Sequence, residues 1–280
     1  MTKINYDYLL IMPAILWIAI FLIFPFFYVI INSFIYKNNV TLNNYITVFQ
    51  TPRFYSSLYR TFLWTIGNVI FQLGLGLGLA ILLNQNFKGV SAVRSLMLIP
   101  WLSSNVIVAL QWKWIFHGTC GIATKLLMDL GITSSPISFF APNVALLSCI
   151  IVNVWRWTPF TALVFLAGLQ VIPQHLYESA LIDGASVFQR FLKITLPLLK
   201  PIIAVWALIT FIRTFNGFEI VWILTGGGPG EATLLLPIHM YTTTFLLGRF
   251  NEGSAISVLM TLMSTIFMIL YVRMAQRSEQ

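Results

Sequence analysis

Three charged side chains interrupt long apolar stretches of this sequence, and their type makes them the first candidates for chemistry. Arg156 lies in the stretch 144–171, whereas Arg213 and Glu219 both lie in the stretch 202–224. Charged groups inside hydrocarbon are rare, and they usually face a helix-bundle interior, a water-filled passage or one another. These residues therefore indicate either a structural pair inside a helix bundle or a hydrophilic passage for a polar solute.

Polar residues recur at every third position around Arg213. On one helix, a spacing of three gives a stripe that rotates slowly, by about 60° at each step. Such a stripe could line a hydrophilic passage through apolar surroundings. The residues of the predicted stripe are Thr210, Arg213, Asn216 and Glu219.

Aromatic residues surround Arg156 in the sequence, namely Trp155, Trp157 and Phe160. The C–H faces of a sugar ring stack on aromatic rings, while the hydroxyl groups need polar partners such as amides and carboxylates. We therefore predict a solute pathway lined by Asn153, Arg156, Trp157, Arg213, Asn216 and Glu219.

Two other interpretations of the buried charges remain open. Arg156 or Arg213 pairs with Glu219 and ties two helices together, or an arginine binds a lipid headgroup. Aromatic residues are also common packing residues, and they make up 15 % of this chain. The pathway and the structural interpretations therefore stand side by side.

Other reactive residue types show no spacing that would make a metal or catalytic site. The two cysteines and the three histidines lie in separate parts of the chain, and the glycine-rich run 226–230 lacks the lysine of a nucleotide-binding loop. We therefore expect no metal, no bound cofactor and no enzymatic activity. An intramembrane enzyme is disfavoured because no nucleophile and base are paired at any recognisable spacing.

The composition defines the surroundings in which these residues must act. Of the 280 residues, only 9 % are charged and 58 % are hydrophobic, so the chain cannot cover a water-exposed surface with charge. Its net charge of +8 comes from scattered Lys and Arg residues without a basic stripe, which argues against nucleic-acid binding. The sequence indicates a membrane protein.

Six stretches with little or no charge are each long enough to cross a hydrocarbon layer about 30 Å thick as a helix. The first is too long for a cleaved signal peptide, so we expect it to be an uncleaved anchor. We predict one all-α membrane domain over residues 1–280, with spans at about 8–33, 62–83, 96–116, 144–171, 202–224 and 254–272.

An even number of spans puts both termini on one side of the membrane. Lys and Arg residues are denser in the connections on that side, which predicts that it is cytoplasmic. The basic residues on this side are Lys3, Lys88, Arg94, Arg190, Lys193, Lys200, Arg273 and Arg277.

The connection at residues 173–200, between the fourth and fifth spans, is patterned rather than featureless. Pro173 can open a helix, Gly184 can end one, and apolar residues between them recur at helical spacing. A short helix of this kind is too short to span a membrane and needs a partner. The pattern consists of Glu178-Ser179-Ala180, then Gly184, then Ile194-Thr195-Leu196-Pro197.

This pattern resembles the hallmark loop of the permease subunits of binding-protein-dependent ATP-binding-cassette (ABC) importers, which reads E-A-A, three residues, G, nine residues, I-x-L-P. The spacing is the same, and Ser179 at the second position is the one departure. Weaker similarity to the carbohydrate-importing branch of that family extends from about residue 10 to the C-terminus. It includes the blocks 43–45, 76–80, 98–100, 167–173 and 225–229.

The resemblance implies a type I ABC importer permease fold and a multi-pass subunit of the bacterial inner membrane. It also implies that the connection contacts a separate ATPase subunit, which would carry ATP and Mg. The residues implied in this coupling are Glu178, Ser179, Ala180, Asp183, Gly184, Ile194, Leu196 and Pro197.

The implied partners are a second, different permease subunit, two ATP-binding subunits and an extracellular or periplasmic solute-binding protein. A sugar or oligosaccharide is the implied solute, and a glycerol phosphate ester, a polyol or a charged oligosaccharide is the alternative. An ion-coupled carrier is less favoured, because it would need buried carboxylates and Glu219 is the one carboxylate within the predicted spans.

Overall fold

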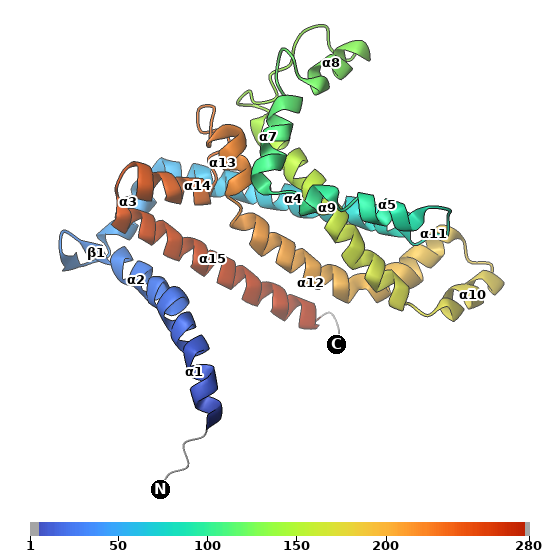
Figure 1. The fold of residues 1–280 in the computed structure, drawn as a ribbon, viewed down its shortest axis with the longest axis horizontal. Coiled ribbons are helices and arrows are strands. Elements are labelled where there is room, and N and C mark those ends of the chain that lie inside the picture. The colour runs from blue at the N-terminus through green and yellow to red at the C-terminus, as the bar shows by residue number, and fades with distance from the viewer. Residues whose placement is uncertain (1–5, 278–280) are drawn as a thin grey trace. The chain divides into compact units, whose positions relative to one another are not determined.

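The computed structural model describes residues 6–277, and this part of the chain is helical apart from one short hairpin and the connecting loops (Figure 1). It consists of two compact units. Unit 1 contains the described residues up to 56 together with 239–263, and unit 2 contains residues 57–238 together with those from 264 onward.

Unit 1 begins with an apolar helical stretch. Its residues Ile11–Ser33 are long and apolar enough to cross a membrane, and the most apolar part of this stretch is not buried by other parts of the chain. The predicted first span is therefore confirmed as a helix. The stretch consists of α1 (Tyr6–Ile18), the π-helical segment η1 (Ala19–Ile23) and α2 (Phe24–Ser33).

A small hairpin follows α2, because Lys37 and Asn38 both adopt positive φ angles, of 48° and 63°, in a tight two-residue turn. Next to it, buried Asn44 donates hydrogen bonds to the carbonyls of Ser33 and Ile35, at 2.9 and 2.8 Å. These bonds pair backbone groups at the end of α2. The elements are β1 (Ile35–Tyr36), β2 (Asn39–Val40) and α3 (Asn43–Gln50).

The C-terminal elements include the last candidate span, Phe250–Met274. Gly253 permits a close approach within unit 1, because a Cβ atom at this position would lie 2.9 Å from Cβ of Thr244. The elements are α14 (Leu236–Tyr241), η3 (Thr242–Leu246) and α15 (Phe250–Arg277).

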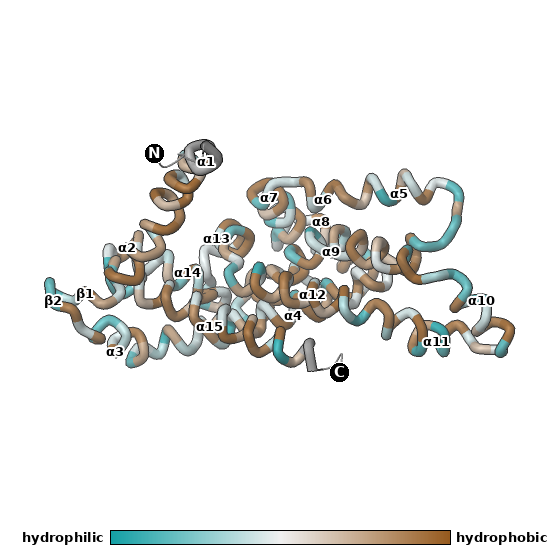
Figure 2. Tube along the Cα trace, turned by 90° about the horizontal axis from the view of Figure 1, so that it is seen from below, coloured by the Kyte–Doolittle hydropathy of each residue, from teal (hydrophilic) through white to brown (hydrophobic). Residues whose placement is uncertain are grey.

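Unit 2 holds most of the long helices. In it α9 packs against α12 and α6, and α7 packs against α13. Figure 2 shows hydrophobic residues along the long helices and hydrophilic residues in connections such as the one before α5. The elements are α4 (Pro52–Leu83), α5 (Val90–Leu96), α6 (Ile99–Leu102), α7 (Asn105–Ile115), α8 (Ile122–Asp129), α9 (Ala145–Val171), α10 (Gln174–Ile182), α11 (Val187–Arg190), η2 (Phe191–Thr195), α12 (Leu196–Phe215) and α13 (Glu219–Thr225).

The core of unit 2 consists of two apolar clusters at different places along α9. One cluster gathers around Trp64, Cys149 and Val221, and the other around Phe165 and Leu199. Polar residues are also buried among the elements that form these clusters, and they include Asn68, Gln72 and Asn153.

Within the described residues, five helical stretches are long and apolar enough to span, and a bent pair makes a sixth. The pair corresponds to the expected span 96–116, and it bends by 94° between Leu102 and Asn105. Ser104 begins the second half, because its side chain accepts a hydrogen bond from the backbone N–H of Val106.

The expected span 202–224 differs more, because the helix begins earlier, at Val187, and ends at Phe215. Asn216 donates from its side chain to the carbonyl of Ile212 at 2.9 Å, and the Trp64 indole donates to the carbonyl of Thr214 at 3.0 Å. These bonds satisfy carbonyls that a continuing helix would use. The segment 219–225 therefore forms a separate short helix, α13.

Candidate functional site

A polar cavity of about 330 Å³ lies beside the break between α12 and α13. Five of the six residues predicted for a solute pathway line it, and they come from α9, from α12 and from the segment that follows α12. The lining consists of Trp64, Asn105, Asn153, Trp157, Arg213, Asn216, Gly217, Phe218, Glu219, Ile220 and Val221.

Arg213 is held in this lining by two neighbours. Its Nη2 donates a hydrogen bond of 2.8 Å to Oε1 of Gln72, on α4. Its guanidinium carbon lies 3.5 Å from the centre of the Trp157 ring, which is a cation–π contact. The guanidinium of Arg213 and the ring of Trp157 thus form one continuous part of the cavity lining.

Arg156 is the one predicted pathway residue that does not line the cavity. It is 8 % exposed, and its Nη2 donates to the carbonyl of Ser103 at 2.9 Å, at the bend between α6 and α7. Its guanidinium carbon is 5.1 Å from the same Trp157 ring. Arg156 therefore adds positive charge behind the lining and ties α9 to the bend.

Glu219 begins α13 and accepts a hydrogen bond from the side chain of Asn105, on α7. In the part of the chain that the structure describes, neither arginine uses Glu219 as a hydrogen-bonding partner. Among the described residues, Glu219 thus forms no direct ion pair with Arg156 or Arg213, and its carboxylate attracts Arg156 only over a longer distance.

The predicted single polar stripe is wrong. Thr210 is fully buried and does not line the cavity, and Glu219 belongs to a different helix from Arg213. A spacing of three places side chains on one helix face only as far as Phe215, because α12 ends there. The break itself, rather than a continuous helix face, brings Asn216 and Glu219 to the cavity.

A buried chain of amide side chains on α4 and α9 supports the arginine. Oδ1 of Asn68 accepts from the side chains of Gln72 at 3.0 Å and Asn153 at 2.6 Å, and Nδ2 of Asn68 donates to the carbonyl of Trp64 at 2.8 Å. An arginine has no acceptor, so the oxygen of Gln72 must face Arg213 and its nitrogen must face Asn68. The orientation of every amide is thereby fixed.

Sequence reasoning missed Asn68 and Gln72, although a signal was present. Polar residues in α4 recur at intervals of four, three and four, which places them on one helix face. All four are fully buried. They are Thr61, Thr65, Asn68 and Gln72.

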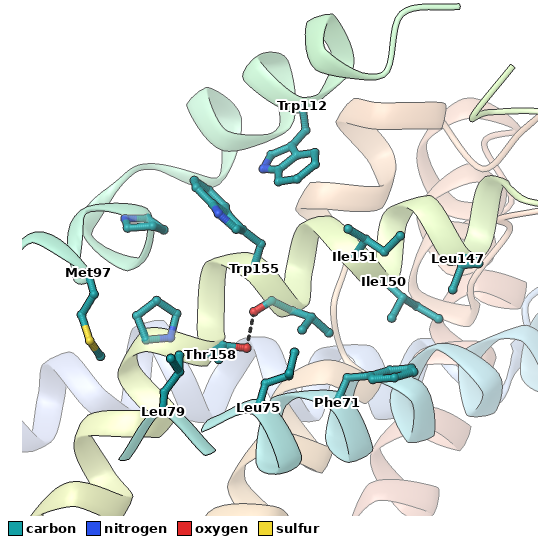
Figure 3. Close-up of a pocket in the computed structure, with 13 residues that line it drawn as sticks. Phe71, Leu75, Leu79, Met97, Trp112, Leu147, Ile150, Ile151, Trp155 and Thr158 are labelled. Carbon is teal, nitrogen blue, oxygen red and sulfur yellow. Dashed lines mark hydrogen bonds between the residues drawn. The ribbon is translucent and has the colours of Figure 1, made fainter. Parts of the chain in front are cut away.

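A second and larger cavity, of about 740 Å³, lies on another face of α9 and is apolar (Figure 3). Trp155 faces this cavity together with Trp112, and the two ring centres are 5.5 Å apart. The hydroxyl of Thr158 is already used, because it donates to the carbonyl of Val154 at 2.7 Å. The cavity suits hydrocarbon and offers little to a hydroxylated solute.

The predicted connection between the fourth and fifth spans contains two short helices with a sharp turn between them. Gly184 has a φ of 74°, the N–H of Ala185 bonds to the carbonyl of Ala180, and the N–H of Gly184 bonds to the carbonyl of Leu181. This is a Schellman end of α10. Ser186 then starts α11 with a capping box to Gln189.

The motif residues of this connection lie on three successive pieces of it. Glu178 and Ser179 are exposed on α10 and Ala180 is half-buried, and Asp183 and Gly184 are exposed at the turn. The last three residues lie where η2 passes into α12, and of these Pro197 is exposed. These three residues are Ile194, Leu196 and Pro197.

Exposed apolar side chains surround the turn. Ile182 is 87 % exposed and Val187 is 74 % exposed, with Leu181 and Phe188 beside them. The hydroxyls of Tyr177 and Thr195, 2.9 Å apart, tie α10 to η2. This hydrogen bond thus stabilises the segment from Pro173 to Lys200, which we call the coupling segment. Its exposed apolar tip consists of Leu181, Ile182, Val187 and Phe188.

No group of three or more His, Cys, Asp or Glu side chains within residues 6–277 has the arrangement of a metal site. The polar cavity instead offers an indole face, amide donors and acceptors, one guanidinium and one carboxylate. Such a set can bind a hydroxylated ring by stacking and hydrogen bonding.

Comparison with known sequences gives a family match for most of the chain. The sequence pattern of the family described as "Binding-protein-dependent transport system inner membrane component" matches residues 72–280. The trehalose/maltose transport system permease protein MalF of Thermococcus litoralis is 38 % identical over 277 residues, which cover 96 % of this chain and 93 % of that protein.

A further relative is the sulfoquinovosyl glycerol transport system permease protein SmoG of Agrobacterium fabrum, with 34 % identity covering 97 % of this chain and 90 % of that protein. Among solved structures, a chain of a bacterial ABC transporter involved in the import of the acidic polysaccharide alginate superposes with a TM-score of 0.88. It is 24 % identical and covers 97 % of this chain and 95 % of that chain, so it shows a common fold.

Proposed function

This chain belongs to the family of binding-protein-dependent transport system inner membrane components, and from that premise we propose that it is a permease subunit that moves a sugar or oligosaccharide inward. The observation that carries the proposal is the polar cavity at the break between α12 and α13. It combines Trp157 with amide, guanidinium and carboxylate groups inside a chain whose surface is otherwise strongly apolar.

The solute meets the lining of this cavity. Trp157 supplies a stacking face, and Asn153, Asn216 and Glu219 supply hydrogen-bonding groups for hydroxyls. Arg156 acts from behind, by fixing the bend next to Trp157. The names of the two relatives support a carbohydrate, since one transports trehalose and maltose and the other sulfoquinovosyl glycerol.

A sugar with an anionic group is the second candidate. Arg213 lines the cavity without a carboxylate as its hydrogen-bonding partner, and a guanidinium binds sulfonate, carboxylate or phosphate through a fork of donors. A glycerol phosphate ester or a charged oligosaccharide belongs to this group, and a polyol would depend on the amides alone. Uptake that requires Arg213 for anionic solutes only would favour this candidate.

The coupling segment transmits the work of an ATPase to the spans. Glu178, Ser179 and Ala180 present one face of α10, and Gly184 and Asp183 form its end. The start of α12 carries the movement into the membrane through Ile194, Leu196 and Pro197. The exposed apolar tip beside the turn suits a cleft on a partner protein.

The complete importer, in this proposal, contains this chain, a second and different permease, two ATP-binding subunits that hold ATP and Mg, and an extracellular or periplasmic binding protein. This chain serves as the transport subunit, and ATP hydrolysis occurs on the separate ATPase. Both termini and the coupling segment lie on the cytoplasmic side of the bacterial inner membrane, because Lys and Arg are denser in these connections.

Reconstitution of the purified subunits in proteoliposomes tests the proposal. We expect uptake of a sugar, from a panel with maltose, trehalose and sulfoquinovosyl glycerol, only when ATP, the ATPase and the binding protein are all present. Transport by this chain alone, driven by an ion gradient, would contradict the proposal and indicate a carrier. Stronger labelling of a Glu178→Cys variant than of the wild type by a reagent added outside would contradict the orientation; the wild type is the reference because its own Cys120 is exposed.

A further inference from the structure

A third cavity in unit 2, of about 350 Å³, lies between the coupling segment and the adjoining ends of α4 and α9. Polar side chains converge on it from four pieces of the chain. Asn84 and Gln85 follow the end of α4, Tyr177 lies on α10, Arg190 ends α11 and Thr195 ends η2. Its volume is in the range of small-ligand pockets.

The cavity is rich in hydrogen-bond donors that the described chain leaves unused. The side chains of Asn84, Gln85 and Arg190 have no hydrogen-bonding partner within residues 6–277. Asn84 and Gln85 are exposed to solvent, whereas Nε of Arg190 is shielded from it. A buried guanidinium N–H without a partner is costly, so a bound acceptor would stabilise it.

The pair formed by Tyr177 and Thr195 adds another donor. Their two hydroxyls carry two protons, and the hydrogen bond between them uses one, whichever residue donates. The other hydroxyl proton stays available for an acceptor in the cavity. No carboxylate is among the lining residues, so the side-chain acceptors in the lining are neutral amide and hydroxyl oxygens, which bind a guanidinium less strongly than an anion does.

The surroundings carry positive charge as well. Lys88 follows α4, and Arg94 on α5 donates from its Nη2 to the carbonyl of Leu83 at 2.6 Å. The connection 173–200 has three basic residues, Arg190, Lys193 and Lys200, against the two carboxylates of Glu178 and Asp183. A donor-rich, basic pocket next to membrane helices has the chemistry that binds a phosphate group.

We propose that this cavity binds the headgroup phosphate of an anionic phospholipid. A free phosphate ion would need only the donors, whereas part of this cavity wall is apolar, through Ile81, Leu169 and Phe191. That wall fits the glycerol and first acyl carbons of a lipid. The lipid would contact the coupling segment, α4 and α9 together. The lining of this cavity shares no residue with the polar cavity, so lipid binding does not depend on which solute is transported.

Native mass spectrometry of the full-length chain in detergent tests this binding without any transport assay. We expect the wild-type chain to retain one phosphatidylglycerol in preference to phosphatidylcholine, and Arg190→Gln to retain about tenfold less, because it loses a charge-assisted hydrogen bond. Lys193→Gln is the matched control, since Lys193 is exposed in the same connection and does not line the cavity. Arg190→Lys is expected to recover part of the retention.

Three results would overturn the proposal. One is equal loss of lipid in the Arg190 and Lys193 variants while both chains keep the wild-type melting temperature, which indicates non-specific attraction. Another is displacement of the lipid by millimolar inorganic phosphate, which indicates a free-anion site. The third is unchanged lipid retention in Arg190→Gln with weaker co-purification of an ATPase subunit, which indicates a protein contact.

Discussion

The polar cavity and the coupling segment are built in opposite ways. In the cavity, side chains from α4, α9 and α12 are joined by buried hydrogen bonds, from Asn68 and Gln72 to Arg213. In the coupling segment, backbone hydrogen bonds at Gly184 and Ala185 fix the turn, and the side chains around it point outward.

Because of this difference, the polar cavity and the coupling segment should respond differently to substitutions. A buried polar network depends on the identity of each side chain, because a donor or acceptor that loses its partner inside the protein has no bulk water to replace it. A capped turn depends on backbone angles, and its exposed side chains tolerate exchange until a partner covers them. Variants in the two regions should therefore fail in different assays.

Gln72→Leu should have the largest effect in the cavity. The variant removes the acceptor of Arg213 and the donor to Asn68, both of which are buried or half-buried. A hydrogen bond to a charged group contributes about 1.5–3 kcal/mol, so we expect a loss of stability in that range and little uptake. Thermal unfolding and proteoliposome uptake measure the two effects.

Gln170→Leu is the control for this variant. Gln170 is exposed near the end of α9 and makes no hydrogen bond through its side chain in the described structure. If both variants unfold at the same temperature as the wild type, the amide network does not support Arg213.

Gly184→Val should give the next largest effect, and it should appear as a loss of coupling. A β-branched residue at a φ of 74° costs about 1–2 kcal/mol, which would disrupt the turn and displace the exposed tip. We expect the ATPase to co-purify poorly and uptake to fall, while solute still binds to the permease.

Gly131→Val controls for the strain alone. Gly131 has a φ of 69° at the end of α8, and the N–H of Ile132 bonds to the carbonyl of Leu127 in the same type of helix end. Equal loss of ATPase binding in both variants would mean that the coupling segment has no special role.

Trp157→Phe should reduce uptake less than the variants above. Together with Trp155→Phe, it tests which face of α9 the solute contacts. The smaller ring weakens the cation–π contact with Arg213, and such contacts contribute about 0.5–2 kcal/mol. We expect uptake to fall severalfold. Trp155→Phe leaves the lining of the polar cavity unchanged, so uptake at the wild-type rate is expected for that variant. A larger defect in Trp155→Phe than in Trp157→Phe would contradict the assignment of the solute site.

The sequence predicted the long helices and five of the residues that line the polar cavity, because both depend on local patterns. Apolar length identifies a span, and a charge within it, such as Arg213, indicates a protected site. The patterned connection with Gly184 was also predicted as a short helix and a turn. The structure has α10 at this position, with the Schellman end described above.

The break after Phe215 could not be predicted, because it depends on contacts distant in the sequence. The indole of Trp64 reaches the carbonyl of Thr214 across 150 positions, and apolar residues continue past the break, so hydropathy alone shows one span. Which of Trp155 and Trp157 meets Arg213 has a similar cause. Residues two positions apart on a helix point about 200° apart, so the two rings lie on different faces of α9, and the packing of α12 on α9 decides which ring Arg213 contacts.

Tyr177→Phe should have the smallest effect, and it tests whether the coupling segment also depends on a side chain. The variant removes only the hydroxyl that pairs with Thr195, and a neutral hydrogen bond of this kind contributes about 1 kcal/mol. Because the helix end at Gly184 stays intact, we expect normal ATPase co-purification and uptake reduced by less than the Gly184 variant reduces it. Tyr59→Phe, at an exposed position on α4, controls for loss of a phenol. Loss of ATPase binding in Tyr177→Phe alone would mean that the brace between α10 and η2, rather than the capped turn, holds the segment in place.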